Sequence, residues 1–419
     1  MSLSSSFGID RLCVYPCTMA LDMRTLVAAR GGNVAEVCDD MMIDERTVCP
    51  PWEDPVTLAV NAGLALLTPD ERESVKLLLV ASESAPDQEK ALSTWVQRYL
   101  GLGDDCRNLE VKHACYGGSG AMHLALSWLA ADALPGETAL VICTDQSRAH
   151  FWRPYEFVMG AGAVAVLLSD NPRFLTIDRG LSGLYTHEVS DLIRPTSRVE
   201  AGHSETSLLS YMDAVDIAFH RYNASLARQG RAPIETVEAL QAWLPFQIYH
   251  APFGGITRRA HRAVMRTLTG WDASAQAVDF ARRVEPSLAF NRRMGGTYAA
   301  STFISLLGLA ASSAAVNGKR VGIYSYGSGS TGEFYSGVFG AGAHEIAQSA
   351  DLHGRLRARQ PATVHDYEEA EMARACFIDA GDFRISTTGL RDLYARHYAG
   401  KKYLTFTGAR DHVRDYSWS

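Results

Sequence analysis

The sequence lacks the features that would place the protein in a membrane or outside the cell. No run of about 18 uncharged apolar residues occurs, which excludes an ordinary transmembrane helix. The segment from Met1 to Phe7 lacks the basic region and the long apolar stretch of a secretory signal peptide. The eight cysteines form no CxxC pair and show no spacing typical of metal ligands, so we interpret them as reduced thiols. We therefore expect a cytoplasmic protein with no metal site.

Lysine is scarce, and the basic residues are unevenly distributed. Only six lysines occur among 40 basic residues, and the net charge of −7 disfavours nucleic acid as a partner. Residues 257–320 nevertheless carry a net charge of +7. This window forms either solvated helix faces or a basic rim that attracts an anionic carrier. Its basic residues are Arg258, Arg259, Arg262, Arg266, Arg282, Arg283, Arg292, Arg293, Lys319 and Arg320.

Long low-complexity linkers and short repeats are also absent, and apolar strand patterns alternate with helical patterns in both halves of the chain. This alternation predicts an α/β fold in which helices cover buried sheets. We expect Asp54 to cap a helix over 55–67. Residues 44–52 are expected to form a loop, and no element is assigned to the more polar residues 172–203. The clearest strand patterns cover 76–81, 138–144, 160–168 and 320–326, and the clearest apolar helices cover 121–131 and 298–315.

The stretch around Cys115 is the most informative part of the chain. An extended run over 109–113 meets the cysteine, and glycines follow before an uncharged helix over 121–131, which we expect to be buried. The glycines would permit a sharp strand-to-helix turn. Such a turn would put the sulfur at a helix N-terminus, which favours the thiolate. The alternative is a structural cysteine that packs like a small apolar residue.

Two further reactive side chains follow predicted strand ends, namely Glu83 and His250. A thiol, a carboxylate base and an imidazole would suffice for acyl transfer with carbon–carbon bond formation. Each signal is weak alone, because Glu83 could be a solvated carboxylate and His250 a structural histidine. The glycine-rich loop 326–330 lacks the GK[ST] ending of a nucleotide-binding loop, and its natural use is to direct backbone N–H groups at a thioester oxyanion.

Taken together, these segments resemble the 3-hydroxy-3-methylglutaryl-CoA synthase family over nearly the whole chain, from about Gly8 to Phe406. The resemblance implies a thiolase-like fold of two related halves, 1–172 and 173–419, packed as five αβαβα layers, and a homodimer. The matching motifs, in order, are Val48-Cys-Pro-Pro-Trp-Glu-Asp54, Ser82-Glu-Ser84 with Asp87, Lys112-His-Ala-Cys-Tyr-Gly-Gly118, Gly160-Ala-Gly-Ala-Val164, Arg194-Pro195, His250-Ala-Pro-Phe253, Arg292-Arg-Met-Gly295 with Tyr298, and Ser325-Tyr-Gly-Ser-Gly329.

The resemblance also implies a role for each reactive group. Cys115 would accept an acetyl group, Glu83 would remove a proton from its methyl group, and His250 would polarise the acceptor ketone. The backbone at Cys115 and Ser328, in the loop that includes Gly327, would stabilise the oxyanions. Asp87 and Asp145 fall on acidic positions of the family and would support the site.

Two departures from the family pattern bear on the substrate carrier. The lysine that usually follows the His-x-Pro motif in the coenzyme A enzymes is missing, and the usual Gly-Asn pair is Gly295-Gly296. Residues 194–213 look more like the synthases of polyketide β-branching, which use phosphopantetheine on acyl carrier proteins. On that reading, donor and acceptor carriers are the partners, no cofactor stays bound, and Arg258, Arg259, Arg292 and Arg293 would contact the carrier.

Three alternatives to a β-branching enzyme remain open from the sequence. The first is a mevalonate-pathway synthase that uses acetyl-CoA and acetoacetyl-CoA. The second is a thiolase or ketoacyl synthase, against which the carboxylate of Glu83 argues. The third is a carrier-binding scaffold without activity, which the presence of all three reactive groups disfavours.

Overall fold

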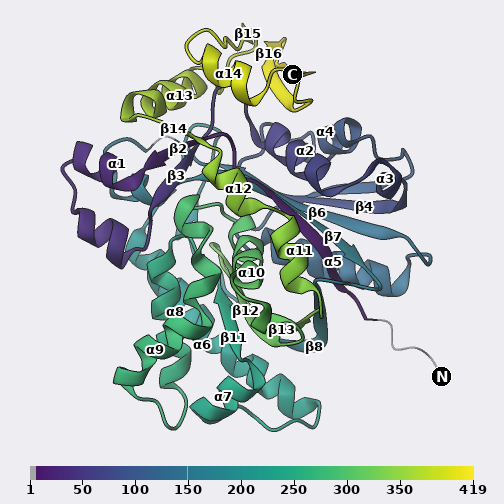
Figure 1. Ribbon diagram of the computed structural model, residues 1–419, viewed down its shortest axis with the longest axis vertical. Helices are drawn as coiled ribbons and strands as arrows, with labels where there is room; N and C mark the ends of the chain where they lie inside the picture. Colours follow the sequence, from purple (N-terminus) through teal and green to yellow (C-terminus); the bar gives the residue numbers. More distant parts are fainter. Residues whose placement is uncertain (1–5, 149) are drawn as a thin grey trace.

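A computed structural model describes residues 6–148 and 150–419, and a mixed nine-stranded sheet runs through its centre (Figure 1). The strand order is β11-β12-β13-β8-β1-β7-β6-β4-β5. The strands are β1 (Gly8–Tyr15), β4 (Val75–Ala81), β5 (Arg107–Val111), β6 (Thr138–Gln146), β7 (Ala161–Ser169), β8 (Leu175–Thr186), β11 (Phe246–Tyr249), β12 (Arg320–Gly327) and β13 (Thr331–Phe339).

The two halves of the sheet meet where β1 lies beside β8. This junction contains two paired positions, Gly8 with Thr176 and Ile9 with Leu175. A Cβ atom on Gly8 would lie 2.0 Å from the carbonyl oxygen of Leu175, so this close approach requires glycine. The chain crosses between the halves in the connection from β7 to β8. We propose that the domain boundary lies there, near residue 172.

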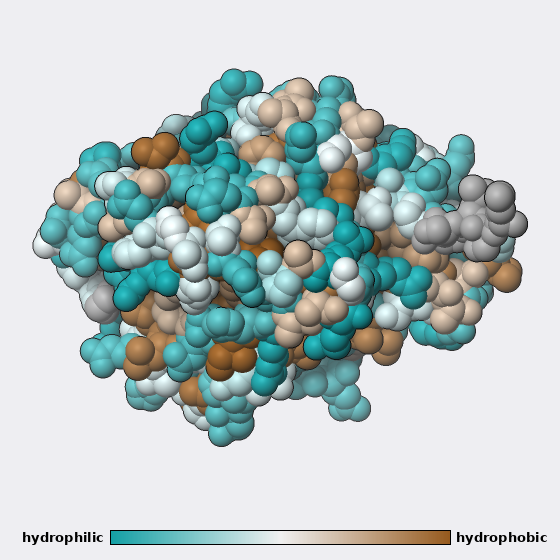
Figure 2. Space-filling view, turned by 90° about the horizontal axis from the view of Figure 1, so that it is seen from below, coloured by the Kyte–Doolittle hydropathy of each residue, from teal (hydrophilic) through white to brown (hydrophobic). Residues whose placement is uncertain are grey.

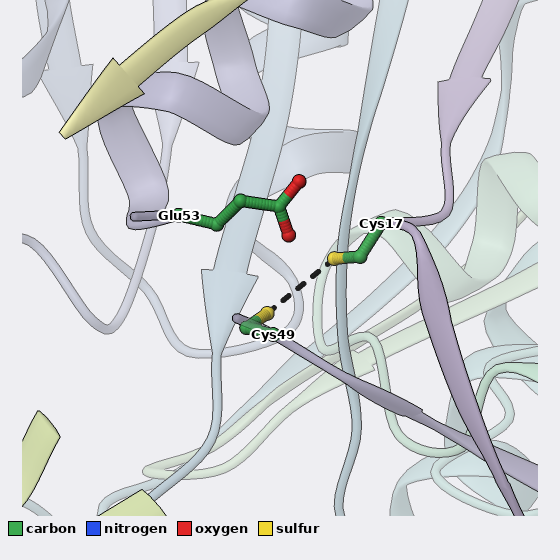
Figure 3. A group of neighbouring side chains, drawn as sticks. All are labelled: Cys17, Cys49 and Glu53. Atoms are coloured by element: carbon green, nitrogen blue, oxygen red, sulfur yellow. Dashed lines mark hydrogen bonds between the residues drawn. The ribbon is translucent and has the colours of Figure 1, made fainter. Parts of the chain in front are cut away.

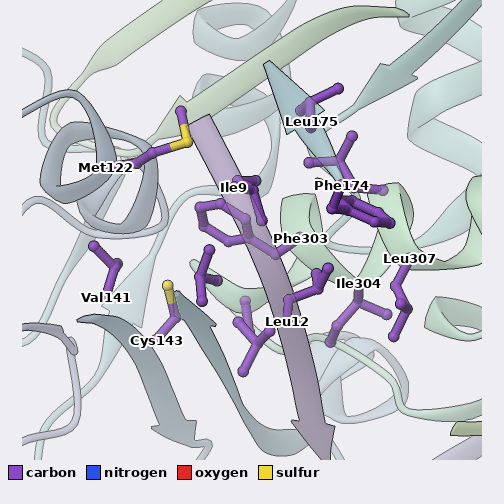
Figure 4. Close-up of a cluster of buried hydrophobic side chains, with 14 of the residues drawn as sticks. Ile9, Leu12, Met122, Val141, Cys143, Phe174, Leu175, Phe303, Ile304 and Leu307 are labelled. Carbon is purple, nitrogen blue, oxygen red and sulfur yellow. The ribbon is translucent and has the colours of Figure 1, made fainter. Parts of the chain in front are cut away.

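Three layers of helices enclose the two halves of the sheet. The first layer holds α2 and α4, the central layer holds α5 and α10, and the third holds α6 and α8, which confirms the expected five layers. Figure 4 shows Phe303 and Ile304 of α10 packed with Val141 and Cys143 of β6 in the central layer. The bounds of these helices are α2 (Pro55–Leu66), α4 (Leu92–Leu100), α5 (Gly117–Ala131), α6 (Ser204–Arg228), α8 (Gly254–Arg266) and α10 (Ala300–Ser312).

The cap predicted for α2 is confirmed. The Asp54 carboxylate accepts a hydrogen bond from the Thr57 N–H at 2.9 Å, and the Thr57 hydroxyl in turn accepts one from the Asp54 N–H at 2.8 Å. This capping box satisfies N–H groups that the first turn of a helix leaves without partners. The second carboxylate oxygen of Asp54 accepts from Arg414 and Tyr416, which joins the start of α2 to the C-terminal hairpin.

Two expectations about local structure are wrong, and a segment without an assigned element contains a strand. Glu45–Val48 is the strand β3 and not part of a loop, because it pairs with β2 over four residues. The polar segment 172–203 contains the twelve-residue strand β8, in which a bulge at Gly180, with φ of 74°, interrupts the alternation of apolar residues. Helix α5 is not buried on all sides, since Leu124 is 61% exposed.

Smaller elements surround the layered core, and those near the top of Figure 1 come from both ends of the chain. Tyr367 and Tyr398 from the C-terminal part pack with Leu26 and Trp52 from the N-terminal part. The remaining elements are β2 (Met19–Asp22), α1 (Met23–Ala29), η1 (Glu36–Asp40), β3, α3 (Pro69–Ser74), η2 (Pro154–Val158), β9 (Leu192–Ile193), β10 (Ala201–Gly202), α7 (Val237–Trp243), α9 (Ala273–Arg283), η3 (Glu285–Leu288), η4 (Asn291–Arg293), η5 (Ala314–Val316), α11 (Ala343–Ser349), α12 (Leu352–Arg357), β14 (Gln360–Pro361), α13 (Val364–Phe377), β15 (Phe383–Arg384), α14 (Arg391–His397), β16 (Leu404–Arg410) and β17 (Val413–Trp418).

The surface is mixed in character. The face at the bottom of Figure 1 is seen directly in Figure 2, where hydrophilic residues predominate and hydrophobic ones form small separate patches. Among the residues that the structure describes, no helix is both long enough and apolar enough to cross a bilayer.

Candidate active site

Cys115 lies on a sharp turn between β5 and α5. The strain of this turn lies at Ala114, whose φ is 42°, a value that non-glycine residues rarely adopt. The Tyr116 N–H closes the turn by donating to the carbonyl of His113 at 3.1 Å. The predicted turn is therefore present, but Ala114, and not a glycine, adopts its left-handed backbone conformation. Gly118 instead allows close packing, because a Cβ atom there would lie 2.5 Å from the Cys143 sulfur.

The Cys115 thiol lies beside the Glu83 carboxyl group. Its Sγ donates a hydrogen bond to Oε1 of Glu83 at 3.3 Å. Protein encloses most of both side chains, and this burial, together with the neighbouring negative charge of Glu83, raises the pKa of Cys115 well above that of a free thiol. The expected stabilisation of the thiolate is thus wrong for the resting protein, because burial and the adjacent carboxylate outweigh the effect of the helix N-terminus.

Asp145 holds the segment that carries Glu83. It follows Cys143 on β6, which lies opposite Ala81 of the parallel strand β4. Its Oδ1 accepts from the Glu83 N–H at 2.9 Å and from the Ser84 hydroxyl at 2.7 Å. The charge of Asp145 adds to the effect of burial and raises the pKa of Glu83. Asp145 therefore both fixes the position of Glu83 and makes its carboxylate more basic.

Arg194 bonds to the other side of Glu83. Its Nη1 donates to the Glu83 carbonyl at 2.6 Å, and its Nη2 pairs with Glu200 at 3.0 Å. Burial opposes the charge on Glu200, but hydrogen bonding to His150 and the charge of Arg194 lower its pKa to about 2. The Tyr298 hydroxyl also donates to Glu200 at 3.4 Å. The motifs included Arg194 and Tyr298, and Glu200 lies in the segment 194–213, but the sequence assigned no role to Glu200 or His150.

His250 immediately follows β11 and is 1% exposed. The backbone N–H of His250 donates to the Tyr324 carbonyl at 2.7 Å, and the backbone carbonyl of His250 accepts from the Tyr211 hydroxyl at 2.8 Å. The ring Nδ1 lies 2.8 Å from Oγ of Ser301, a buried residue in the first turn of α10. Burial lowers the pKa of His250 to about 3, so the imidazole is neutral at physiological pH.

The start of α10 brings the surroundings of His250 close to Cys115. A Cβ atom on Gly118 would lie 3.0 Å from the Phe303 ring and 3.3 Å from the Ala299 carbonyl oxygen. The helix that carries Ser301 therefore begins against the first turn of α5. These contacts connect His250, through Ser301, to the neighbourhood of the Cys115 turn.

The glycine-rich loop after β12 packs directly on the cysteine turn. A Cβ atom on Gly327 would lie 2.5 Å from the Tyr116 nitrogen and 2.6 Å from the His113 oxygen, so this contact requires glycine. Fully buried Asp191 anchors the loop by accepting from the Gly329 N–H at 3.0 Å and the Tyr326 hydroxyl at 3.1 Å. Asp191 lies in the polar segment that had no assigned element. Ser328 is half-buried in this loop.

The remaining candidate residues are Asp87 and four arginines of the basic window. Asp87 is exposed, and its carboxylate accepts from the backbone of Glu89 and Lys90 in a local turn, away from the bonds that hold Glu83. Arg292 pairs with Asp44 through two 2.9 Å bonds, and Arg293 pairs with Glu45 at 3.2 and 3.3 Å. Arg258 and Arg259 are exposed on α8, which starts four residues after His250.

The observed arrangement suits thioester chemistry. A nucleophilic thiol has a carboxylate of raised pKa within hydrogen-bonding reach. A neutral imidazole can donate a hydrogen bond to a carbonyl without transferring a charge to it. The buried side chain of Asp145 and the partly buried side chain of Arg194 hold the base in place.

Two family models match the chain: Hydroxymethylglutaryl-coenzyme A synthase N terminal over residues 53–172 and Hydroxymethylglutaryl-coenzyme A synthase C terminal over residues 257–398. The chain is 36% identical over 376 residues to the polyketide biosynthesis 3-hydroxy-3-methylglutaryl-ACP synthase PksG of Bacillus subtilis, with 87% of each chain covered. It is 27% identical over 369 residues to a hydroxymethylglutaryl-CoA synthase of Enterococcus faecalis, covering 87% of this chain and 91% of the relative.

The solved structures that superpose on this chain include synthases of the same family. The curacin biosynthetic pathway HMG synthase in complex with holo donor-ACP superposes with a TM-score of 0.91 at 33% identity, covering 99% of this chain and 100% of the other. MvaS in complex with 3-hydroxy-3-methylglutaryl coenzyme A superposes with a TM-score of 0.87 at 29% identity, covering 100% of both chains. The thiolase-like fold predicted from the sequence is confirmed.

Proposed function

This chain belongs to the hydroxymethylglutaryl-CoA synthase family of condensing acyltransferases, and from that premise we propose that it performs polyketide β-branching. The donor is an acetyl group on an acyl carrier protein, and the acceptor is the β-ketone of a polyketide intermediate on another carrier. The product is a β-hydroxy-β-carboxymethyl thioester. The observation that carries this proposal is the hydrogen bond between Cys115 and Glu83, which places a base beside the nucleophile.

Both the relatives and the sequence favour a carrier-protein substrate over coenzyme A. Identity is 36% to the 3-hydroxy-3-methylglutaryl-ACP synthase but 27% to the coenzyme A synthase of Enterococcus faecalis. The lysine that follows the His-x-Pro motif in the coenzyme A enzymes is absent. The mevalonate-pathway reaction with acetyl-CoA and acetoacetyl-CoA is the second candidate, since those enzymes also align along most of the chain.

The first step is acetyl transfer to Cys115. The thiol proton passes along the 3.3 Å hydrogen bond to Glu83 while the sulfur attacks the acetyl thioester. The phosphopantetheine sulfur leaves and takes that proton from Glu83, which restores the Glu83 carboxylate for the next step. Backbone N–H groups at Cys115 and in the loop of Gly327 and Ser328 stabilise the oxyanion, a role supported by the packing of that loop on the cysteine turn.

The second step forms the new carbon–carbon bond. The Glu83 carboxylate takes a proton from the acetyl methyl group, and the resulting enolate adds to the β-ketone of the acceptor. Glu83 then returns the proton to the new alkoxide. A water molecule finally cleaves the thioester to Cys115, which releases the new carboxylate and restores the thiol. Burial and the charge of Asp145 raise the pKa of Glu83, which makes it a stronger base for this step.

His250 acts as a neutral hydrogen-bond donor to the acceptor. The Ser301 hydroxyl oxygen accepts from the Ala251 N–H at 3.4 Å, which leaves its proton for Nδ1 of His250. That bond puts the ring proton on Nε2. A neutral Nε2–H can polarise the acceptor ketone while the carboxylate of Glu83 performs the proton transfers.

The proposed partners are donor and acceptor carrier proteins and a second copy of the chain. Exposed arginines of α8, including Arg258 and Arg259, present positive charge to an acidic carrier. A homodimer is supported by the edge strand β5, which exposes Leu109, and by α5, which exposes Leu124. No resident cofactor takes part, because phosphopantetheine arrives and leaves with the substrates.

Reconstitution with acetyl-carrier and β-ketoacyl-carrier proteins tests the proposed function. Intact-mass analysis of the acceptor should show the branched product with the wild-type enzyme and no product with Cys115→Ala. Product formed by Cys115→Ala would refute the covalent mechanism. Carrier binding without any acylation of the wild-type protein would indicate a scaffold instead.

A further inference from the structure

Three buried side chains gather outside the active site, at Cys17, Cys49 and Glu53 (Figure 3). Their sulfur and carboxylate atoms all lie within 4.8 Å of one another. The two sulfurs are 3.4 Å apart, and the three residues are 4%, 5% and 2% exposed, in that order. The sequence spacing of the cysteines did not predict this cluster, because the fold brings together residues 32 positions apart.

The three residues come from different parts of the fold. Cys17 follows β1, Cys49 follows β3, and Glu53 precedes the capping residue of α2. The backbone at Cys17 has φ of 54°, which is uncommon for any residue except glycine and persists only where the surroundings enforce it. The cluster therefore sits where three segments converge, with its groups directed inward.

Glu53 lacks a cationic partner among the described residues. Its Oε1 accepts from the hydroxyl groups of Tyr15 and Tyr398, each at 2.7 Å. Its Oε2 is buried and has no hydrogen-bond partner in the described part of the chain, and Figure 3 shows the carboxylate directed toward the Cys17 sulfur. Burial raises the pKa of Glu53 to about 7. A buried carboxylate is normally paired with a cation or coordinates a metal.

We propose that Cys17, Cys49 and Glu53 bind one transition-metal cation, with zinc as the ion that suits two sulfurs and one oxygen. A disulfide between the cysteines is the competing outcome, but it would use only the two sulfurs and leave Oε2 of Glu53 without a partner. A metal ion engages all three groups. The proposal is independent of the condensation chemistry at Cys115.

The geometry and charge of the cluster suit this ion. Two sulfurs bound to tetrahedral zinc lie about 3.8 Å apart, so Cys17 and Cys49 need to separate by only about 0.4 Å. Zinc replaces the protons of both thiols, and two thiolates, one carboxylate and Zn²⁺ leave a net charge of −1. A water molecule would take the fourth coordination position of such an ion.

The tyrosines around Glu53 would orient the carboxylate ligand. The Tyr398 hydroxyl lies 2.8 Å from Oγ1 of Thr18 and bonds to Glu53, so it joins the C-terminal part of the chain to the cluster. Such partners typically contribute about 10- to 100-fold to metal affinity. The metal would therefore stabilise the contact between the C-terminal elements and the core.

Cobalt titration of the full-length, metal-stripped protein tests the proposal. Co²⁺ bound to thiolates gives an intense sulfur-to-metal absorption band, and we expect one equivalent to bind and zinc to displace it. Cys17→Ser, Cys49→Ser and Glu53→Gln should each weaken binding at least about tenfold. Cys38→Ser is the matched control, because Cys38 is a buried thiol outside the cluster, and should bind like the wild type.

A second measurement on the wild type does not depend on the folding of variants. Zinc binding should release at least about two protons per chain into a weakly buffered indicator solution, since both thiols must lose theirs and Glu53 must be ionised. Absence of the cobalt band or of proton release would overturn the proposal. Recovery of a Cys17–Cys49 disulfide under the conditions of metal loading would also overturn it, as would unchanged cobalt affinity in the three cluster variants.

Discussion

Sγ of Cys115 donates to Oε1 of Glu83 at 3.3 Å, and the N–H of Glu83 donates to Oδ1 of Asp145 at 2.9 Å. The first bond lets the carboxylate take the thiol proton, and the second fixes the carboxylate beside the sulfur. Both groups also have raised pKa values, because they are enclosed by protein and face other negative charges. Acetyl transfer removes the thiol from this pair and leaves Glu83 next to the acetyl methyl group.

Replacing the base should separate the two halves of the reaction. Glu83→Gln keeps the size of the side chain but cannot accept a proton. Acetylation of Cys115, seen as a gain of about 42 Da in intact-mass analysis, should therefore slow but still reach completion, because water can take the proton of a thiol, whereas the far less acidic acetyl methyl group needs the carboxylate. The condensation rate should fall by about 10²- to 10⁴-fold. Asp87→Asn is the matched control, since that carboxylate lies in an exposed turn. Normal condensation by Glu83→Gln would remove this residue from the mechanism.

Asp145 should set the pH dependence of condensation. Its charge raises the pKa of Glu83, so Asp145→Asn should lower that pKa while the amide oxygen still accepts from the Glu83 N–H. The rate of a base-catalysed step rises with pH until the base is ionised. The profile of Asp145→Asn should therefore move to lower pH. A shift to higher pH would show that the loss of positioning dominates.

Replacing Arg194 should shift the pH profile of condensation in the opposite direction. Its positive charge lowers the pKa of Glu83, so Arg194→Gln should raise that pKa and move the profile to higher pH. The loss of its ion pair with Glu200 acts in the same direction, because it exposes Glu83 to another negative charge. Measuring the pre-steady-state condensation rate from pH 5 to 9 tests both variants in the same way, and equal profiles for the two would contradict this electrostatic account.

Ser301 should position His250 without touching the substrate. Ser301→Ala removes the bond to Nδ1, so the ring loses its preferred tautomer and a fraction of its Nε2–H donors. We expect kcat for condensation to fall about tenfold or more, while the acetylation rate of Cys115 is unchanged. Thr302→Val is the control, since the neighbouring hydroxyl is buried and has no partner among the described residues. Equal kinetics for the two variants would assign Ser301 a purely structural role.

The basic window divides into two classes of arginine. Arg259→Glu and Arg262→Glu alter exposed positions of α8, so we expect acetylation by the carrier protein to slow several-fold at low salt, with little change for acetyl-CoA. Arg292→Glu instead places like charges beside Asp44, so it should lower the melting temperature. Carrier-dependent kinetics that are unchanged by the α8 variants would show that this helix face is merely solvated.

Much of the core was predictable because its strands are continuous apolar runs and helix α2 carries a clear cap. The strands β4, β6, β7 and β12 and the cap at Asp54 follow from local patterns. The strands β3 and β8 are two of those missed, and each has a physical reason. Glu45–Val48 is short and begins with two charged residues, and the bulge at Gly180 disrupts the alternation within β8.

The site was predictable in its residues but not in its electrostatics. Cys115 was identified from its turn, yet the spatially adjacent carboxylates that raise its pKa cannot be seen from local sequence. Glu200 and Asp191 lie in a polar segment without periodicity, and only the folded chain brings them to Arg194 and the loop at Gly329. Arg292 and Arg293 looked available in the sequence because their acidic partners are 248 residues away.

The most direct test of the account is a donor competition at Cys115. Equal concentrations of ¹³C-labelled acetyl-carrier protein and unlabelled acetyl-CoA are mixed with the enzyme, and the acetylated Cys115 peptide is resolved by mass within the first turnover. The account predicts mostly labelled acetyl on Cys115. Mostly unlabelled acetyl on Cys115 would favour a coenzyme A enzyme, and no acetyl on this residue from either donor would contradict the mechanism itself.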